Sequence, residues 1–190
     1  MNRREFVALG ASCAALFASQ ASPAFQPSAV GGMKLLAVAD RRYRDSVRFA
    51  AAIAGAGGSV MEIGSDIGTL WFGDIEPRWR DGGLRLAGLT LPSDLFVLER
   101  LADRSRSATV YAGCHDWRGP CSQHRLSGAM RLARPLAAIR TGGLDWPRAL
   151  GKALAAETIL ARAETHHLSF ELAAASDSPK YLTSWLMTLA

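Results

Sequence analysis

The sequence predicts an α/β fold: a three-layer α/β sandwich with a mostly parallel or mixed sheet, of Rossmann-like or flavodoxin-like type. Two observations lead to this prediction. Short apolar runs of strand length alternate along the chain with stretches of helical periodicity. In addition, the first strand, helix and strand follow one another closely enough to form a compact crossover, whose two strands should be parallel.

Apolar spacing and turn residues define the elements expected in the first half. KLLAVAD is a continuous apolar run, as expected of a strand covered on both faces. The next stretch carries Val47, Ala50 and Ala54 at helical spacing and ends in glycines, which can stop a helix. The expected order is strand 34–40, helix 41–58, strand 59–64, a helical or irregular segment at 67–79, strand 84–90, helix 93–104 capped by Ser93, and strand 108–113.

The second half continues the alternation. RPLAAIR is short and apolar, which favours a strand, and the long stretch that begins at Trp146 is amphipathic with helical spacing. The expected order is strand 134–140, helix 146–164, and strands 169–175 and 181–188, of which the last two could be antiparallel.

The N-terminal residues have the layout of an export signal. Arg3 and Arg4 precede an apolar run of 13 residues at 6–18 and then a stretch of small residues. A spanning helix needs about 20 apolar residues, so a cleaved signal is favoured over a membrane anchor. The paired arginines resemble a twin-arginine (Tat) signal. We therefore expect a signal peptide at 1–24, a tether at 25–33, a single domain at 34–190, and a periplasmic or secreted protein.

Charge and motifs exclude several function classes. The net charge is +5 and the basic residues are interspersed with acidic ones, so nucleic acid is not an expected partner. The mature chain contains no second apolar segment of spanning length, so no stable membrane span is expected. Neither G-x-G-x-x-G nor a P-loop occurs, and G-x-S-x-G is absent, which disfavours a nucleotide cofactor and a common serine hydrolase. The cofactor, if any, stays unidentified.

Polar residues follow the expected strands at their carboxyl ends, where ligands collect in open α/β sheets. We expect these residues to form a polar rim that contacts a small molecule. The alternative for each residue taken singly is that it caps the following helix. The rim comprises Asp40, Arg42, Ser46, Asp66 and Thr90.

The stretch AGCHDWRGPCSQH at 112–124 could be a disulfide, a metal site or an ordinary loop with free thiols. In an oxidising compartment, the favoured one is a disulfide between Cys114 and Cys121 across a turn at Gly119-Pro120. The weaker alternative is a metal site at which Cys121 and His124 bind the ion together with a residue at 115 or 116. The catalytic candidates in that case are His115, Asp116 and His124, with a metal-activated water.

Trp71 and Trp79 could line an apolar ligand pocket, although core or lid positions are more usual for such residues.

A set of residues spread over 34–190 resembles a family of small bacterial proteins that carry a twin-arginine signal. This resemblance supports export and implies no particular reaction, and the cysteine pair does not belong to the shared pattern. The residues that carry it are Asp40, Ser46, Phe49-Ala50, Asp66, Leu70-Trp71, Pro77, Gly88-Leu89-Thr90, Leu98-Glu99-Arg100-Leu101 and Ser184-Trp185.

Together these features favour an exported α/β protein that binds a small molecule or acts as an accessory factor. The competing expectation is a metal-assisted hydrolase or lyase that uses the 114–124 stretch. A third is an interaction module with a protein partner in the cell envelope.

Overall fold

The computed structural model describes residues 33–102, 107–118, 121–128, 133–156, 166–173 and 181–189. The expected signal at 1–24, the tether up to residue 32 and the expected helical residues 157–164 lie outside this part of the chain.

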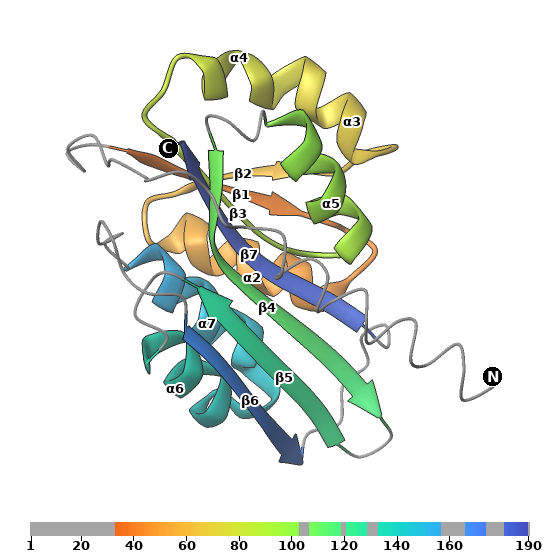
Figure 1. Cartoon of the computed structure of the whole chain (residues 1–190), viewed down its shortest axis with the longest axis vertical. Helices are drawn as coiled ribbons and strands as arrows, with labels where there is room; N and C mark the ends of the chain where they lie inside the picture. Colours follow the sequence, from red (N-terminus) through yellow and green to blue (C-terminus); the bar gives the residue numbers. More distant parts are fainter. Residues whose placement is uncertain are drawn as a thin grey trace.

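The described residues form one seven-stranded mixed sheet with helices, which confirms the α/β class (Figure 1). The strand order is β2-β1-β3-β7-β4-β5-β6. Strand β1 is parallel to β2 and β3, and every other neighbouring pair is antiparallel. The strands are β1 (Lys34–Ala39), β2 (Ser59–Glu62), β3 (Leu84–Thr90), β4 (Ser107–Arg118), β5 (Cys121–Gly128), β6 (His166–Ala173) and β7 (Tyr181–Leu189).

The helices provide the apolar side chains of two separate cores. Alternation along the strands sends successive side chains to opposite faces, so β1, β3 and β7 contribute to both cores, whereas β4 and β5 contribute to the core that contains Phe49. Phe49, Trp146 and Leu150 pack on one face, and Trp71, Trp79 and Leu98 on the other. The helices are α2 (Arg44–Gly55), α3 (Ile67–Leu70), the π-helix η1 (Trp71–Ile75), α4 (Glu76–Arg80), α5 (Pro92–Leu101), α6 (Ala133–Thr141), the 3₁₀ helix η2 (Gly143–Asp145) and α7 (Trp146–Ala155).

The segment at 134–140 is a helix, so the expected strand there is wrong. Pro135 lies in the first turn of α6, where a missing N–H costs nothing. Pro135 and Ile139 are buried four residues apart while Ala137 is exposed, which is a helical and not an alternating pattern. The other expected strands and helices fall on described elements of the same type with shifted ends, whereas β5 was not predicted.

Residues 112–118 and 121–124 lie in the paired strands β4 and β5 and not in a loop. Their register pairs Cys121 with Arg118 and Cys114 with Arg125. The two cysteines are therefore four positions apart along the hairpin, about 13 Å at the usual rise of a strand. This exceeds the roughly 4–7 Å between Cα atoms that a disulfide requires. No disulfide joins them, and that prediction is corrected.

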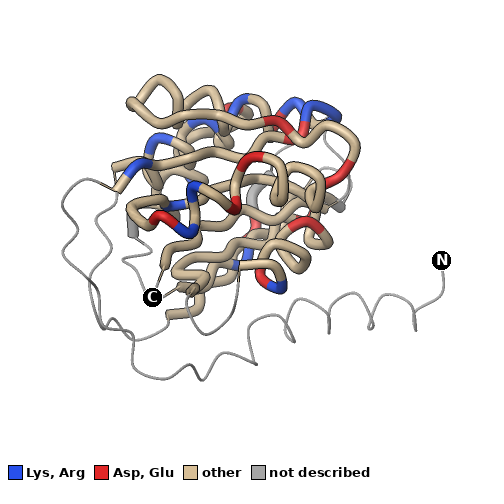
Figure 2. Tube along the Cα trace, turned by 90° about the horizontal axis from the view of Figure 1, so that it is seen from above, with Lys and Arg blue, Asp and Glu red and all other residues tan. Residues whose placement is uncertain are grey.

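Basic and acidic residues lie beside one another over the described surface (Figure 2). Short ion pairs such as Arg41–Glu62 at 2.6 Å and Arg80–Glu76 at 2.7 Å account for part of this mixing. Within the described ranges, none of the helices has the length and apolar character needed to cross a bilayer.

Candidate functional site

The carboxyl ends of β1 and β3 lie where the helices that connect neighbouring strands switch from one face of the sheet to the other. Strand β1 is flanked by β2 and β3. Helix α2, which connects β1 to β2, packs in one core, whereas α3 and α4, which connect β2 to β3, pack in the other. In open α/β sheets this divergence marks the usual position of a ligand. The parallel register, extended two residues beyond Val38–Gly88, places Asp40 beside Thr90.

Asp40 is buried and is held from two directions. Its backbone N–H donates to Ser46 Oγ at 2.8 Å, which ties the end of β1 to α2. Its carboxylate accepts hydrogen bonds from Arg42 Nε at 3.0 Å and from Arg42 Nη2 at 2.7 Å. This paired contact raises the pKa of the Arg42 guanidinium above its ordinary value. The Arg42 side chain remains 63% exposed, so it offers further N–H groups to solvent or to a ligand.

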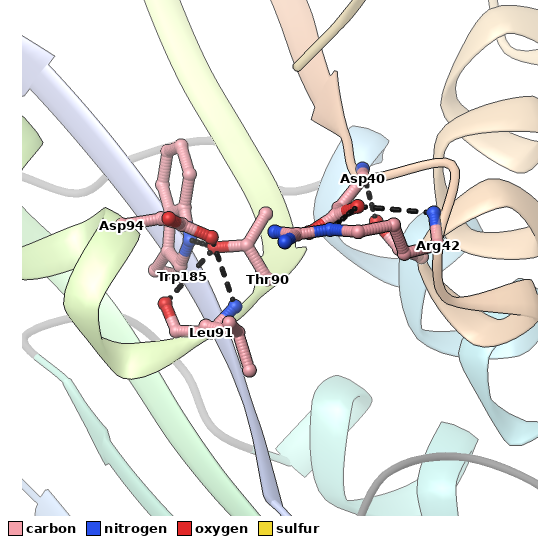
Figure 3. A network of polar contacts seen from close by, with 7 residues as sticks. Asp40, Arg42, Thr90, Leu91, Asp94 and Trp185 are labelled. Carbon is pink, nitrogen blue, oxygen red and sulfur yellow. Dashed lines mark hydrogen bonds and ion pairs between the residues drawn. The ribbon is translucent and has the colours of Figure 1, made fainter. Parts of the chain in front are cut away.

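A second set of polar side chains lies opposite Asp40 and Arg42, at the end of β3 and the start of α5. Thr90 Oγ1 accepts a hydrogen bond from Trp185 Nε1 at 3.1 Å. Asp94, in the first turn of α5, accepts one from the Leu91 backbone N–H at 3.2 Å. Burial raises the pKa of the Asp94 carboxyl, and the nearby charge of Asp40 raises it further. Figure 3 shows the Arg42 guanidinium directed toward Thr90, between the two carboxyl groups.

Thr183 extends this polar row onto β7. It is paired with Thr90 on one side and with Cys114 on the other, and directly paired residues share a face of the sheet. Thr183 is fully buried, yet its hydroxyl has no hydrogen-bond partner among the described residues. Unpaired buried hydroxyls are rare, because each costs about 1–3 kcal/mol. We call Asp40, Arg42, Thr90, Asp94 and Thr183 the strand-end cluster.

Asp66 does not join the strand-end cluster through any contact that the structure records. It is exposed and caps α3: its carboxylate accepts from Thr69 N at 2.8 Å and from Thr69 Oγ1 at 2.7 Å. These bonds lower the pKa of Asp66. The capping alternative therefore accounts for this residue, and the backbone contact of Ser46 likewise gives that residue a structural role.

A chain of buried polar side chains crosses β7, β4 and β5. Tyr111 OH lies 3.0 Å from Ser184 Oγ, which lies 2.7 Å from His115 Nε2. His115 Nδ1 lies 2.7 Å from His124 Nδ1, and His124 Nε2 lies 2.8 Å from Ser122 Oγ. We call these five residues the histidine chain; all five are at most 1% exposed.

The histidine chain is satisfied when both imidazoles are neutral. A single proton between the two Nδ1 atoms makes one ring the donor and the other the acceptor. Burial lowers the pKa of His115 well below 6.5 and that of His124 to about 4, so neither ring is charged at neutral pH. Trp146 covers both rings, with its centroid 4.5 Å from that of His115 and 5.3 Å from that of His124.

Ser184, His115 and His124 have the connectivity of a nucleophile, a base and an orienting group. Their burial argues against that role. Ser184 is fully buried in the middle of β7, so no substrate reaches its Oγ in this conformation. The chain is better understood as a satisfied polar network that fixes the packing of Trp146 on the sheet.

The metal alternative at 114–124 is not supported by the side-chain directions. His115 and His124 are paired across the hairpin and share a face, so their sequence neighbours Asp116 and Gln123 project from the other. Cys121, an odd number of residues from His124, also projects from that other face. Within the described ranges, no three His, Cys, Asp or Glu residues are grouped to hold a metal ion.

Three features of these sites are not evident from the sequence. Asp94 follows Ser93, which is also a typical cap residue, and Thr183 carries no motif. The histidine chain lies in a stretch whose cysteines favour a disulfide or a metal site. The alternation of Ser122, His124 and Leu126 with polar residues is the signal that predicts a strand there.

Comparisons of the chain with protein-family models, with curated proteins and with solved structures find no match.

Proposed function

We propose that the protein binds a small polar molecule at the strand-end cluster. The observation that carries this proposal is the Arg42 guanidinium, which is 63% exposed and is held by the buried Asp40 carboxylate at the end of β1, beside Thr90 at the end of β3. The location agrees with the ligand position of three-layer, Rossmann-like sandwiches, the class to which we assign the fold.

The available groups set the chemistry of the ligand. Arg42 has N–H donors left after its bonds to Asp40, and these can bind a carboxylate or carbonyl oxygen. Burial raises the pKa of Asp94, so its carboxyl keeps a proton to a higher pH than an exposed carboxyl does. We infer a ligand that carries both an acidic group and hydroxyl or amine groups, such as a hydroxy acid or an amino acid.

Thermal-shift measurements with a panel of hydroxy acids, amino acids and sugars test this proposal. We expect at least one member to raise the melting temperature of the wild type and not that of Arg42→Gln. Arg41→Gln is the matched control, because Arg41 is the neighbouring arginine and pairs with Glu62, outside the cluster. Ligands that stabilise the wild type and Arg42→Gln equally would overturn the assignment of this site.

The paired arginines and the apolar run at 6–18 support a further proposal, that the protein is exported and acts in the periplasm or outside the cell. N-terminal sequencing of the protein recovered from the envelope fraction tests it. A chain that stays in the cytoplasm with residues 1–24 attached would contradict export.

A further inference from the structure

Asp94 is a nearly buried carboxyl group that keeps one oxygen open to a ligand. The residue is 9% exposed and lies in the first turn of α5. Its Oδ2 accepts a hydrogen bond from the Leu91 backbone N–H at 3.2 Å. Its Oδ1 accepts none from the described residues, yet it is not one of the polar atoms that the fold buries without a partner, so Oδ1 reaches solvent. A carboxylate oxygen in this position can accept a hydrogen bond from a bound molecule.

The strand-end cluster holds two carboxyl groups and one guanidinium, so its own charges leave Asp94 short of positive charge. The Arg42 guanidinium is bonded to the Asp40 carboxylate through Nε and Nη2. Burial is the main reason that the pKa of Asp94 is raised, and the Asp40 carboxylate raises this pKa more than the Arg42 guanidinium lowers it. Because a buried charge is costly unless it is paired, a bound cation would stabilise the ionised Asp94 carboxylate.

Arg42 presents a second binding edge beside this carboxyl group. Asp40 occupies the edge that Nε and Nη2 form, at 3.0 Å and 2.7 Å. The edge that Nη1 and Nη2 form is left over, on a side chain that is 63% exposed. Its two parallel N–H groups match the two oxygens of a carboxylate. The guanidinium lies between the Asp40 and Asp94 side chains (Figure 3), so one small molecule can contact both Arg42 and Asp94.

We propose that Asp94 determines the specificity of the strand-end cluster, by selecting an α-amino acid over the hydroxy acid with the same side chain. This inference rests on the proposed function. The Arg42 guanidinium binds the carboxylate of the amino acid, and Asp94 Oδ1 accepts a hydrogen bond from the ammonium group on the neighbouring carbon. A hydroxyl group can donate to the same oxygen, but only the ammonium group brings the positive charge that Asp94 lacks. We expect a preference of about tenfold.

Isothermal titration calorimetry of the full chain at pH 7 with matched pairs of ligands tests this inference. The two members of a pair share a side chain and differ in an amine or a hydroxyl group: alanine and lactate, serine and glycerate, phenylalanine and phenyllactate, each as both enantiomers. We expect at least one amino acid to bind the wild type about tenfold more tightly than the matching hydroxy acid. This comparison needs no substitution, so it does not depend on how a variant folds. Equal affinities within every pair that binds, or tighter binding of the hydroxy acids, would overturn the inference.

Substitutions assign the preference to Asp94. Asp94→Asn removes the charge at nearly constant size and should reduce the preference for the amino acid from about tenfold to about twofold or less. Asp81→Asn, the same change at an exposed position before β3, is the matched control and should keep the preference. An unchanged preference in Asp94→Asn, together with loss of binding in Arg42→Gln, would overturn the role of Asp94 and leave the proposed function standing. Binding of none of these ligands, or binding that Arg42→Gln does not weaken, would overturn both.

Discussion

Acidification should destabilise the protein through the histidine chain. Burial lowers the pKa of His124 from 6.5 to about 4, so the unfolded chain takes up a proton before the folded one as the pH falls. The titration of His124 therefore leaves the free energy of unfolding unchanged above about pH 7. It lowers that free energy progressively as the pH falls from about 6.5 to about 4. The full shift corresponds to about 3 kcal/mol, of which about 2 kcal/mol falls between pH 7 and pH 5. His115, whose pKa is lowered further, adds to the loss in the same direction.

Urea unfolding followed by circular dichroism at pH 7, 6 and 5 measures this loss. His124→Gln removes one titrating group and should reduce the difference between pH 7 and pH 5 by about 2 kcal/mol. Ser169→Ala, at an exposed position of β6, removes no titrating group; it is the control and should leave the difference unchanged. Comparison between variants also cancels the contribution of Asp94, whose raised pKa acts in the opposite direction. Equal pH dependence in the wild type and His124→Gln would refute the reasoning.

Three further substitutions test individual contacts by equilibrium unfolding. Ser184→Ala leaves two buried partners unpaired and should lower the free energy of unfolding by about 1–3 kcal/mol. Ser169→Ala on exposed β6 is the control and should lower it by less than about 0.5 kcal/mol. Equal losses in the two variants would count against the histidine chain. Gly88→Ala places a Cβ into the Trp185 ring and should cost about 1–3 kcal/mol; a neutral result would mean that the ring moves freely. Asp66→Ala removes the cap of α3 and should cost about 1 kcal/mol at pH 7, a loss that should vanish at a pH below the pKa of Asp66.

The parts of the fold that sequence predicts well are those where pattern and environment agree. The run LLAVA at 35–39 is apolar throughout and lies in β1, where all five residues are buried. Residues 134–140 are too few to separate a period of 2 from one of 3.6, although Pro135 suits the first turn of a helix. The strands at 107–118 and 121–128 are hard to predict because their cysteine and histidine residues are also typical of disulfides and metal sites.

Some residues of the candidate site could be predicted from the sequence and others could not. Asp40, Arg42 and Thr90 could be found because a strand end is visible in sequence and topology brings such ends together. Thr183 and the partners of the histidine chain could not, because their contacts depend on β7 lying between β3 and β4. The position of β7 between β3 and β4 depends on contacts between residues far apart in the sequence, and a local sequence pattern does not specify such contacts.

Native mass spectrometry tests the central claim, ligand binding at the strand-end cluster, most directly. The wild type, Arg42→Gln and Arg41→Gln are each purified after incubation with a saturating small-molecule extract of the producing cells. The account predicts a non-covalent small-molecule adduct on the wild type and Arg41→Gln that is absent or much reduced on Arg42→Gln. The same adducts on all three proteins, or none on any of them, would contradict it.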